Sequence, residues 1–184
     1  MPCPAIRLLD GADKISSDQW LAVHRAAHRV GLRSNITIMF GAIEEPDSWA
    51  RHLLVTRALQ EETGGFTEFV PLPFVHMATP LFLRGRARRG PTYRETVLMH
   101  AVARLHYATL IDNIQVSWVK MGVEGARDIL RAGANDVGGT LMDENISRAA
   151  GAAHGQEMDV ATLEALVEPL GRPLRQRGTL YQTL

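Results

Sequence analysis

Apolar positions at helical spacing alternate with short β-branched runs along most of the chain. A first helix is predicted over residues 17–30, because Ser16 and Gln19 form a capping-box pattern ahead of apolar residues at helical spacing. Gly31 is placed to end that helix. Residues 35–41 (NITIMFG) are short, β-branched and bounded by glycine, which is typical of a buried strand. The pattern therefore opens with a helix followed by a strand.

The same alternation predicts three further strands and the helices that separate them. The strands are expected over residues 67–73, 112–118 and 134–142. The helices are expected from Pro46 to Gly64, from Thr92 through Leu105, through Ala126 and Leu130 to Gly133, near 145–150 and near 160–170. Pro71 and Pro73 are expected to shorten the strand over 67–73, since proline has no N–H to donate to a sheet.

This order of elements indicates an α/β fold with parallel strands. Strands separated by helices of roughly 10–18 residues pair in parallel through crossover helices. Four such units and a leading helix amount to about half of a (β/α)8 barrel, which typically needs ~250 residues. We expect one domain over residues 1–184, with an N-terminal segment in 1–15, four βα units in 16–155 and a C-terminal helix and tail in 156–184. A smaller open sheet and part of a barrel are both compatible with this pattern.

Composition narrows the classes of function. The formal net charge is zero, so no overall field favours nucleic acid or an anionic membrane. The chain has no run of about 18 apolar residues and no basic-then-apolar leader, so a cytoplasmic location is expected. Cys3 is the single cysteine, and the sequence therefore predicts no internal disulfide and no cysteine-rich metal site.

Polar side chains gather where the predicted strands end. Parallel α/β proteins carry functional groups at the carboxyl ends of their strands. The candidates in or just beyond the four strands are Gly41, Glu44, Glu68, His76, Gln115, Ser117, Lys120, Asn135, Asp136, Thr140, Glu144 and Ser147. Glu44 has an alternative role at the positive end of the next helix, where a carboxylate is favourable. His76 could equally be a histidine of a proline-bounded loop.

Strand alternation separates these candidates into two faces. Gln115 and Ser117 share one face and are expected to point inward, opposite Ile114, Val116 and Trp118. Asn135 and Asp136 are adjacent, so they must face opposite ways in a regular strand.

Three other patterns are weaker. His24 and His28 stand four apart on a helix, but with no acidic third ligand nearby a solvated helix face is favoured over a metal site. The arginines of residues 84–89 could contact a phosphate, although exposed arginines are the default interpretation. Gly138 and Gly139 could bind phosphate or serve only close packing.

Four segments together resemble a known enzyme family. They are GLRSNITIMFG (31–41), GGFTEFVPLPFVH (64–76), IQVSWVKMG (114–122) and ANDVGGTLMDENISRAAG (134–151). In this order and spacing, with the tail GRPLRQRGTLY, they are similar to the C-terminal half of the second, tyrosine-using radical S-adenosylmethionine (SAM) domain of the FO synthase family. The resemblance covers about residues 5–181. Menaquinone-pathway radical enzymes, which share a similar Gly–Phe–Thr–Glu–Phe segment, are the nearest alternative.

The resemblance implies a reaction, two cofactors and two groups of site residues. Enzymes of this family use SAM and a 4Fe-4S cluster to join a tyrosine-derived fragment to 5-amino-6-(D-ribitylamino)uracil, which gives a deazaflavin coenzyme precursor. The segment with Thr37, Met39, Gly41 and Glu44 looks like a degenerate form of the family's adenine-contacting motif. Polar groups on the later strands would suit the hydroxyl and amide groups of ribityl-uracil; these are Glu68, His76, Gln115, Ser117, Asn135, Asp136 and Glu144.

The sequence also departs from the family pattern. Radical enzymes of this family hold the cluster through three closely spaced cysteines. This chain has a single cysteine, Cys3, which lies ahead of the region that resembles the family. We therefore expect no cluster in this chain and no radical activity from it alone. A separate N-terminal half-barrel, or a second copy of the chain meeting open sheet edges, would be the partner. A non-catalytic half-barrel that binds a ligand or assembles through those edges is the alternative function.

Overall fold

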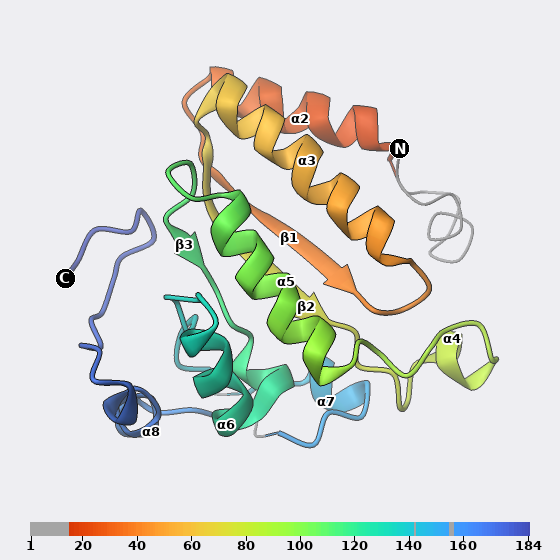
Figure 1. The fold of residues 1–184 in the computed structure, drawn as a ribbon, viewed down its shortest axis with the longest axis vertical. Coiled ribbons are helices and arrows are strands. Elements are labelled where there is room, and N and C mark those ends of the chain that lie inside the picture. The colour runs from red at the N-terminus through yellow and green to blue at the C-terminus, as the bar shows by residue number, and fades with distance from the viewer. Residues whose placement is uncertain (1–14, 142, 155–156) are drawn as a thin grey trace.

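The fold is α/β, with a parallel sheet whose strands are joined by helices (Figure 1). A computed structural model describes residues 15–141, 143–154 and 157–184. The strands are β1 (Ser34–Phe40), β2 (Phe66–Pro73) and β3 (Asn113–Ile114), in the order β1-β2-β3. The helices are α2 (Ser17–Arg29), α3 (Pro46–Thr63), α4 (Pro80–Leu83), α5 (Tyr93–His106), α6 (Trp118–Arg131), α7 (Ile146–Ala149), α8 (Val160–Val167) and the 3-10 helix η1 (Glu168–Leu170).

The predicted helix starts are confirmed by their caps. Ser16 and Gln19 form a reciprocal capping box at α2, and Thr92 and Glu95 form another at α5. Helix α3 begins with Pro46, and after Thr63 it is capped by Gly64, which has a left-handed backbone with φ of 61°. The short helix α4 was not predicted. Cys3 and the rest of residues 1–14, with Met142, lie outside the described residues.

Strand β2 runs through both of its prolines, so the expectation that they shorten it was wrong. Pro71 pairs with Ile38 of β1, and Pro73 pairs with Phe40. Successive residues of a strand direct their backbone groups to opposite neighbours. The carbonyl of Phe69 accepts from Gln115 on the β3 side, whereas the N–H of Phe74 donates to β1. The backbone groups of Pro71 and Pro73 point to the β3 side, like those of Phe69. Strand β3 ends before it reaches these two prolines. The N–H groups that proline lacks would therefore have had no strand partner there.

The third and fourth strands are shorter than predicted. β3 contains only Asn113 and Ile114, because α6 already begins at Trp118. Of the strand predicted over 134–142, the structure keeps one isolated parallel bridge between Gln115 and Asp136. Gly138 has a φ of 74°, and its N–H donates to the Asp136 carboxylate over 2.6 Å. This local turn diverts the segment from the sheet after one bridge.

The core lies between one face of the sheet and helices α3, α5 and α6 (Figure 1). Ile36, Phe69 and Ile114 bring one fully buried side chain from each strand into this core. Phe69 packs against Tyr107 with ring centroids 5.1 Å apart, and the Tyr107 hydroxyl lies 2.6 Å from the Thr56 hydroxyl. The sheet thus has one face closed by helices.

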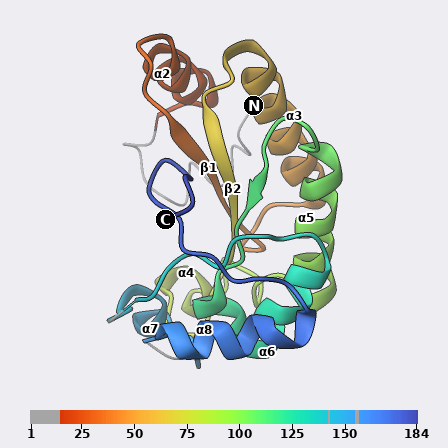
Figure 2. The same cartoon turned by 90° about the vertical axis from the view of Figure 1, so that its left-hand side faces the viewer.

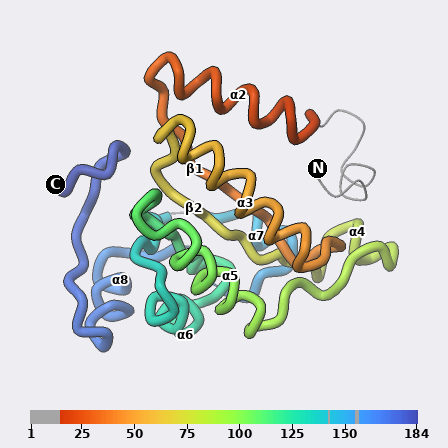
Figure 3. Tube along the Cα trace, turned by 45° about the horizontal axis from the view of Figure 1, so that its top comes forward, coloured from red at the N-terminus to blue at the C-terminus, as the bar shows by residue number. Residues whose placement is uncertain are grey.

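The opposite face of the sheet is covered differently. Thr37 and Met39 of β1 are exposed on it, with Met39 54% accessible. The C-terminal tail, residues 171–184, returns across this face from α8, as Figure 2 shows. Helix α2 packs on α3 at one end of the molecule, whereas α6 and α8 pack together at the other (Figure 3). Among the described residues, no helix is long and apolar enough to span a membrane.

Candidate functional site

The sheet face opposite the helices, called here the inner face, gathers three of the residues predicted to bind the substrate: Glu68, Gln115 and Asp136. Ile114 enters the core, so Gln115 points the other way, as the alternation predicted. Bridged residues of parallel strands share a face, which places Asp136 beside Gln115. Glu68 alternates with Phe69 and therefore also belongs to this face. Ser117 is half-buried beyond the strand, where its carbonyl accepts the N–H groups of Lys120 and Met121 at the start of α6.

Two buried carboxylates of the inner face are held by the C-terminal tail. The guanidinium of Arg177 donates to Asp136 and lies 3.5 Å from the Glu68 carboxylate. The Tyr181 hydroxyl donates to Glu68 over 2.9 Å, and Arg177 stacks on the Tyr181 ring with 4.3 Å between guanidinium carbon and centroid. Glu68, Asp136, Arg177 and Tyr181 are called the tail cluster below. The sequence did not indicate this cluster, because its members are separated by up to 113 residues.

The tail cluster changes the acidity of Glu68. Burial and the nearby negative charge of Asp136 raise the pKa of Glu68 to about 7, against the hydrogen bond from Tyr181 and the positive charge of Arg177. Glu68 therefore titrates near neutral pH. Burial likewise raises the pKa of Tyr181, so the phenol stays protonated and continues to donate.

Glu44 shapes the loop that follows β1. Its carboxylate is buried and accepts from the backbone N–H groups of Gly41, Ala42 (3.2 Å) and Ile43 (3.0 Å). The indole N–H of Trp49 donates to the same carboxylate over 2.9 Å. The position that caps α3 belongs to Glu45, so Glu44 is not the helix cap. The structure instead uses Glu44 to fix its own loop.

Gly41 is required in this loop for two reasons. Its φ is 88°, in the left-handed region that favours glycine. A Cβ at this position would also lie 2.3 Å from Pro91, which the loop before α5 presses against it. The end of β1 and the start of α5 are therefore in direct contact. Thr37 and Met39, the other residues of the predicted SAM motif, lie on the inner face.

Asn135 is not brought together with the inner-face residues. Its side-chain oxygen accepts from Arg104 of α5 over 2.6 Å and from the N–H of Ile114 over 2.9 Å. Asn135 is exposed and Asp136 is buried, which confirms that they face opposite ways. Asn135 ties the fourth segment to β3 and to α5.

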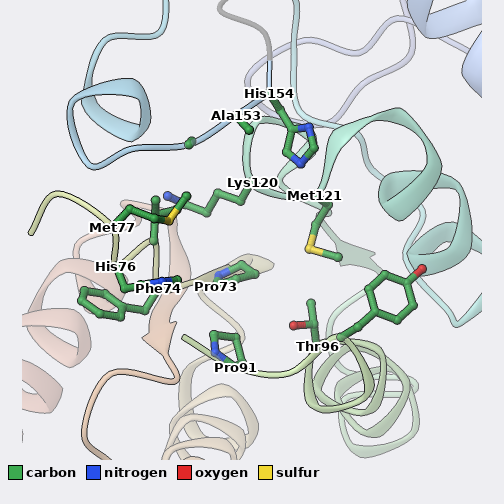
Figure 4. Close-up of a pocket in the computed structure, with 13 residues that line it drawn as sticks. Pro73, Phe74, His76, Met77, Pro91, Thr96, Lys120, Met121, Ala153 and His154 are labelled. Carbon is green, nitrogen blue, oxygen red and sulfur yellow. The ribbon is translucent and has the colours of Figure 1, made fainter. Parts of the chain in front are cut away.

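A pocket of about 310 Å³ opens where β2 ends and α5 and α6 begin (Figure 4). His76 lines it, with its ring packed edge-on against Phe82 at 4.5 Å between centroids. Lys120 crosses the pocket from α6, and its ammonium donates to the Ser147 hydroxyl over 3.1 Å. Ser147 in turn donates its N–H to both oxygens of Glu144, at 3.0 Å each. His76, Lys120 and Glu144 thus meet in one region, some distance along the strands from the tail cluster.

Lys120 is a functional candidate that its place beyond the third predicted strand did not set apart from the other polar residues. Burial lowers its pKa, and the negative charge of Glu144 opposes that shift. The chain contains eighteen arginines and two lysines, Lys14 and Lys120. The rarity of lysine in this arginine-rich chain could have marked Lys120 as a functional residue. Lysine differs from arginine in that its ammonium is a compact cation whose pKa responds to burial.

The two histidines of α2 contact neighbouring hydroxyl groups, and no third ligand joins them among the described residues. His28 is buried, and its ring nitrogens lie 2.7 Å from the Thr63 hydroxyl and 2.8 Å from the Ser34 hydroxyl. His24 also contacts Ser34, over 3.0 Å. The expectation of a solvated helix face is therefore wrong for His28, since its ring packs against Thr63 at the end of α3, Ser34 and Phe66. In the arginine segment, Arg88 pairs with Glu95 of α5.

The described residues do not fit an iron–sulfur cluster. They include no cysteine, and no three His, Cys, Asp or Glu side chains among them converge as metal ligands. The SAM motif fits in part: Thr37 and Met39 are presented at the inner face, but Gly41 is buried and its N–H donates to the Glu44 carboxylate, which is occupied by its own loop.

Comparison with known proteins identifies the family. Residues 63–183 match the family described as the CofH/MqnC C-terminal region. The chain is 54% identical over 168 residues to an FO synthase of Nocardia farcinica and 51% identical over 171 residues to one of Mycobacterium tuberculosis, covering 91% and 93% of this chain. It is 48% identical over 179 residues, 97% of its length, to the 5-amino-6-(D-ribitylamino)uracil--L-tyrosine 4-hydroxyphenyl transferase of Methanopyrus kandleri.

The matched regions are partial in the relatives. The chain spans 19% and 20% of the two FO synthases and 48% of the Methanopyrus transferase. The family match begins at Thr63 and includes β2, the Lys120 pocket and the tail cluster. The chain belongs to the CofH/MqnC C-terminal region family.

Proposed function

We propose that this chain is the C-terminal part of an FO synthase that transfers a tyrosine-derived group to 5-amino-6-(D-ribitylamino)uracil. The observation that carries this proposal is the 48% identity, over 97% of the chain, to the Methanopyrus transferase whose name states those two compounds. The relatives named FO synthase support the same assignment over the menaquinone-pathway alternative. The product would be the deazaflavin precursor of a redox coenzyme.

The proposed architecture is the second half of a (β/α)8 barrel. Three features support it: the parallel order β1-β2-β3, the bridge that adds a fourth segment to β3, and a face that carries polar groups instead of a helix layer. In an intact barrel this inner face would line the interior. Glu68, Asp136 and the tail would then close one part of it, and the pocket with Lys120 would lie at the strand ends.

The residues present indicate which cofactor this chain would contact and which it would leave to a separate half-barrel. The described residues do not fit the cluster, so we derive no step through it and assign it to a separate N-terminal half-barrel. Thr37 and Met39 of β1 would face SAM, with Glu44 holding the loop of Gly41, Ala42 and Ile43 that follows the strand. A cytoplasmic location and activity only with a partner half are part of the same proposal.

Gln115 is the inner-face residue best suited to contact the ribityl-uracil. Its amide points to the inner face, and within the described part of the chain no hydrogen bond to its side chain is present. An amide can both donate and accept, which matches the hydroxyl and carbonyl groups of that compound. Gln115→Ala should weaken ribityl-uracil binding about tenfold, whereas Gln176→Ala, on the exposed tail, should not. Equal affinity of the two variants would remove Gln115 from the site.

Complementation tests the proposed function. The chain would be co-expressed anaerobically with the N-terminal half of the Methanopyrus transferase and supplied with SAM, tyrosine and ribityl-uracil. The expected result is coupled product and 5′-deoxyadenosine from the pair, and neither from either part alone. Turnover by the isolated chain would contradict the assignment of the cluster to a separate half. An assembled pair with its cluster reconstituted but with no coupled product would contradict the proposed function itself.

A further inference from the structure

Lys120 is a half-buried cation with no carboxylate partner in the part of the chain that the structure describes. Its ammonium donates to the Ser147 hydroxyl over 3.1 Å and makes no ion pair within 4.0 Å among those residues. Glu144, the carboxylate whose charge acts on Lys120, accepts from the Ser147 N–H instead. A partly desolvated ammonium without a counter-charge favours an anion as a further partner.

The pocket around Lys120 has the volume for a small aromatic group and apolar residues on several sides. Phe74, Pro73 and Pro91 form one side, and Met77 and Met121 form the others, as Figure 4 shows. Its volume of about 310 Å³ lies at the lower end of the roughly 300–1,000 Å³ range of small-molecule sites. Proline and methionine surfaces pack well against an aromatic ring. Tyr93, Thr96, His76 and His154 complete the lining, so the pocket combines the Lys120 cation with apolar surfaces and a few polar groups.

We infer that this pocket binds an aromatic amino acid, with Lys120 receiving the α-carboxylate and the apolar walls receiving the ring. The inference rests on the proposed function, in which tyrosine is a substrate. Ribityl-uracil has no carboxylate, so it does not match the cation. SAM also carries an amino-acid carboxylate, but its sulfonium and adenosine exceed the pocket, and its proposed contacts lie at Thr37 and Met39.

Lysine NMR measures this contact directly. The full chain would be labelled with 13C-lysine, which reports only Lys14 and Lys120, and the Lys120 signal would be assigned by its loss in Lys120→Met. L-tyrosine should shift the Lys120 Cε signal and raise the Lys120 pKa, because a bound carboxylate favours the charged ammonium. Tyramine, which lacks only the carboxylate, should leave that pKa unchanged.

Affinity gives the second readout. Lys120→Met should weaken L-tyrosine binding about 10- to 100-fold, the range expected for loss of a charge-assisted hydrogen bond. Arg29→Met is the matched control, because it removes a positive charge from an exposed side chain at the far end of α2. Its affinity for L-tyrosine should equal that of the wild type. The wild-type pKa measurement decides the question even if Lys120→Met folds poorly.

Three results would overturn the inference. L-tyrosine could fail to bind at millimolar concentration, SAM alone could move the Lys120 signal, or Lys120→Met could bind L-tyrosine as tightly as Arg29→Met does. The proposed function is tested separately by the complemented pair. Product formation by a pair carrying Lys120→Met, at unchanged KM for tyrosine, would reject this pocket and leave the function standing.

Discussion

Tyr181 donates a hydrogen bond of 2.9 Å to Glu68, a residue 113 positions earlier in the chain. This bond attaches the C-terminal tail to a buried carboxylate on the inner face of the sheet. Arg177 stacks on the same tyrosine and reaches Asp136, so the tail is held by a hydrogen bond, an ion pair and a cation–π contact. The end of the chain is therefore part of the folded domain.

The first prediction concerns pH. The pKa of Glu68 is raised to about 7 in the folded chain, against about 4.3 for an ordinary glutamate. Between these values the folded state holds a proton that the unfolded state has lost, so this group lowers stability as pH rises. From pH 5 to pH 8, the unfolding free energy of the wild type should fall relative to Glu68→Gln by at least about 1.4 kcal/mol, equivalent to one pKa unit.

Urea unfolding at several pH values measures this difference. The exposed Glu164, changed to glutamine, should leave the pH profile parallel to that of the wild type. If Glu68→Gln and the wild type also run in parallel, Glu68 has an ordinary pKa and the electrostatic account of the tail cluster is wrong.

The second prediction concerns Arg177. Its removal leaves Glu68 and Asp136 buried without their cation, with side chains only 4% and 7% exposed. Arg177→Met should destabilise the chain by about 2–4 kcal/mol at pH 8, the lower part of this range reflecting the partial exposure of the arginine. The loss should be smaller at pH 5, where Glu68 is protonated. Arg175→Met, on the exposed part of the same tail, is the control and should cost less than about 0.5 kcal/mol.

The third prediction separates two effects at Gly41. Gly41→Ala should cost about 3 kcal/mol or more, since it combines a left-handed φ of 88° with a 2.3 Å approach to Pro91. Gly31 has a similar φ of 85° but no atom within 4 Å of its Cβ position. Gly31→Ala should therefore cost only about 1 kcal/mol. Equal losses in thermal or urea unfolding would show that the β1 loop can move away from Pro91.

The fourth prediction concerns Glu44. Glu44→Gln keeps one acceptor oxygen, removes the charge and leaves some of its four donors unsatisfied. A stability loss of about 1.5–3 kcal/mol is expected. Glu45→Gln is the adjacent control, because the exposed Glu45 side chain makes no capping bond. A wild-type unfolding curve for Glu44→Gln would mean that the loop does not depend on this carboxylate.

Local sequence patterns predicted the helices well and the later strands poorly. Capping boxes at Ser16 and Thr92 depend on residues three apart, so the sequence contains the whole interaction. The strand over 134–142 has the composition of a strand, yet only Asp136 bridges to Gln115. Whether a strand continues depends on a neighbour to pair with, and β3 ends after two residues.

The sequence predicted which residues belong to the candidate site better than it predicted which of them contact one another. Alternation alone placed Gln115 opposite Ile114 and turned Asn135 away from Asp136. It could not show that Asn135 binds Arg104, or that Glu44 is occupied by its own loop. These partners come from other helices or from the detailed path of a loop, which periodicity does not describe.

By itself, the amino-acid sequence determined the alternation of helix and strand, the parallel α/β class and the segments that resemble FO synthase. These follow from spacing of 2 or 3.6 residues and from capping within one turn, which are short-range effects. Only the tertiary structure decided that Tyr181 and Arg177 hold Glu68 and Asp136, and that Lys120 crosses a pocket between β2 and α6. Those contacts depend on how the whole chain is packed, because burial and the nearest charge are set by residues distant in sequence.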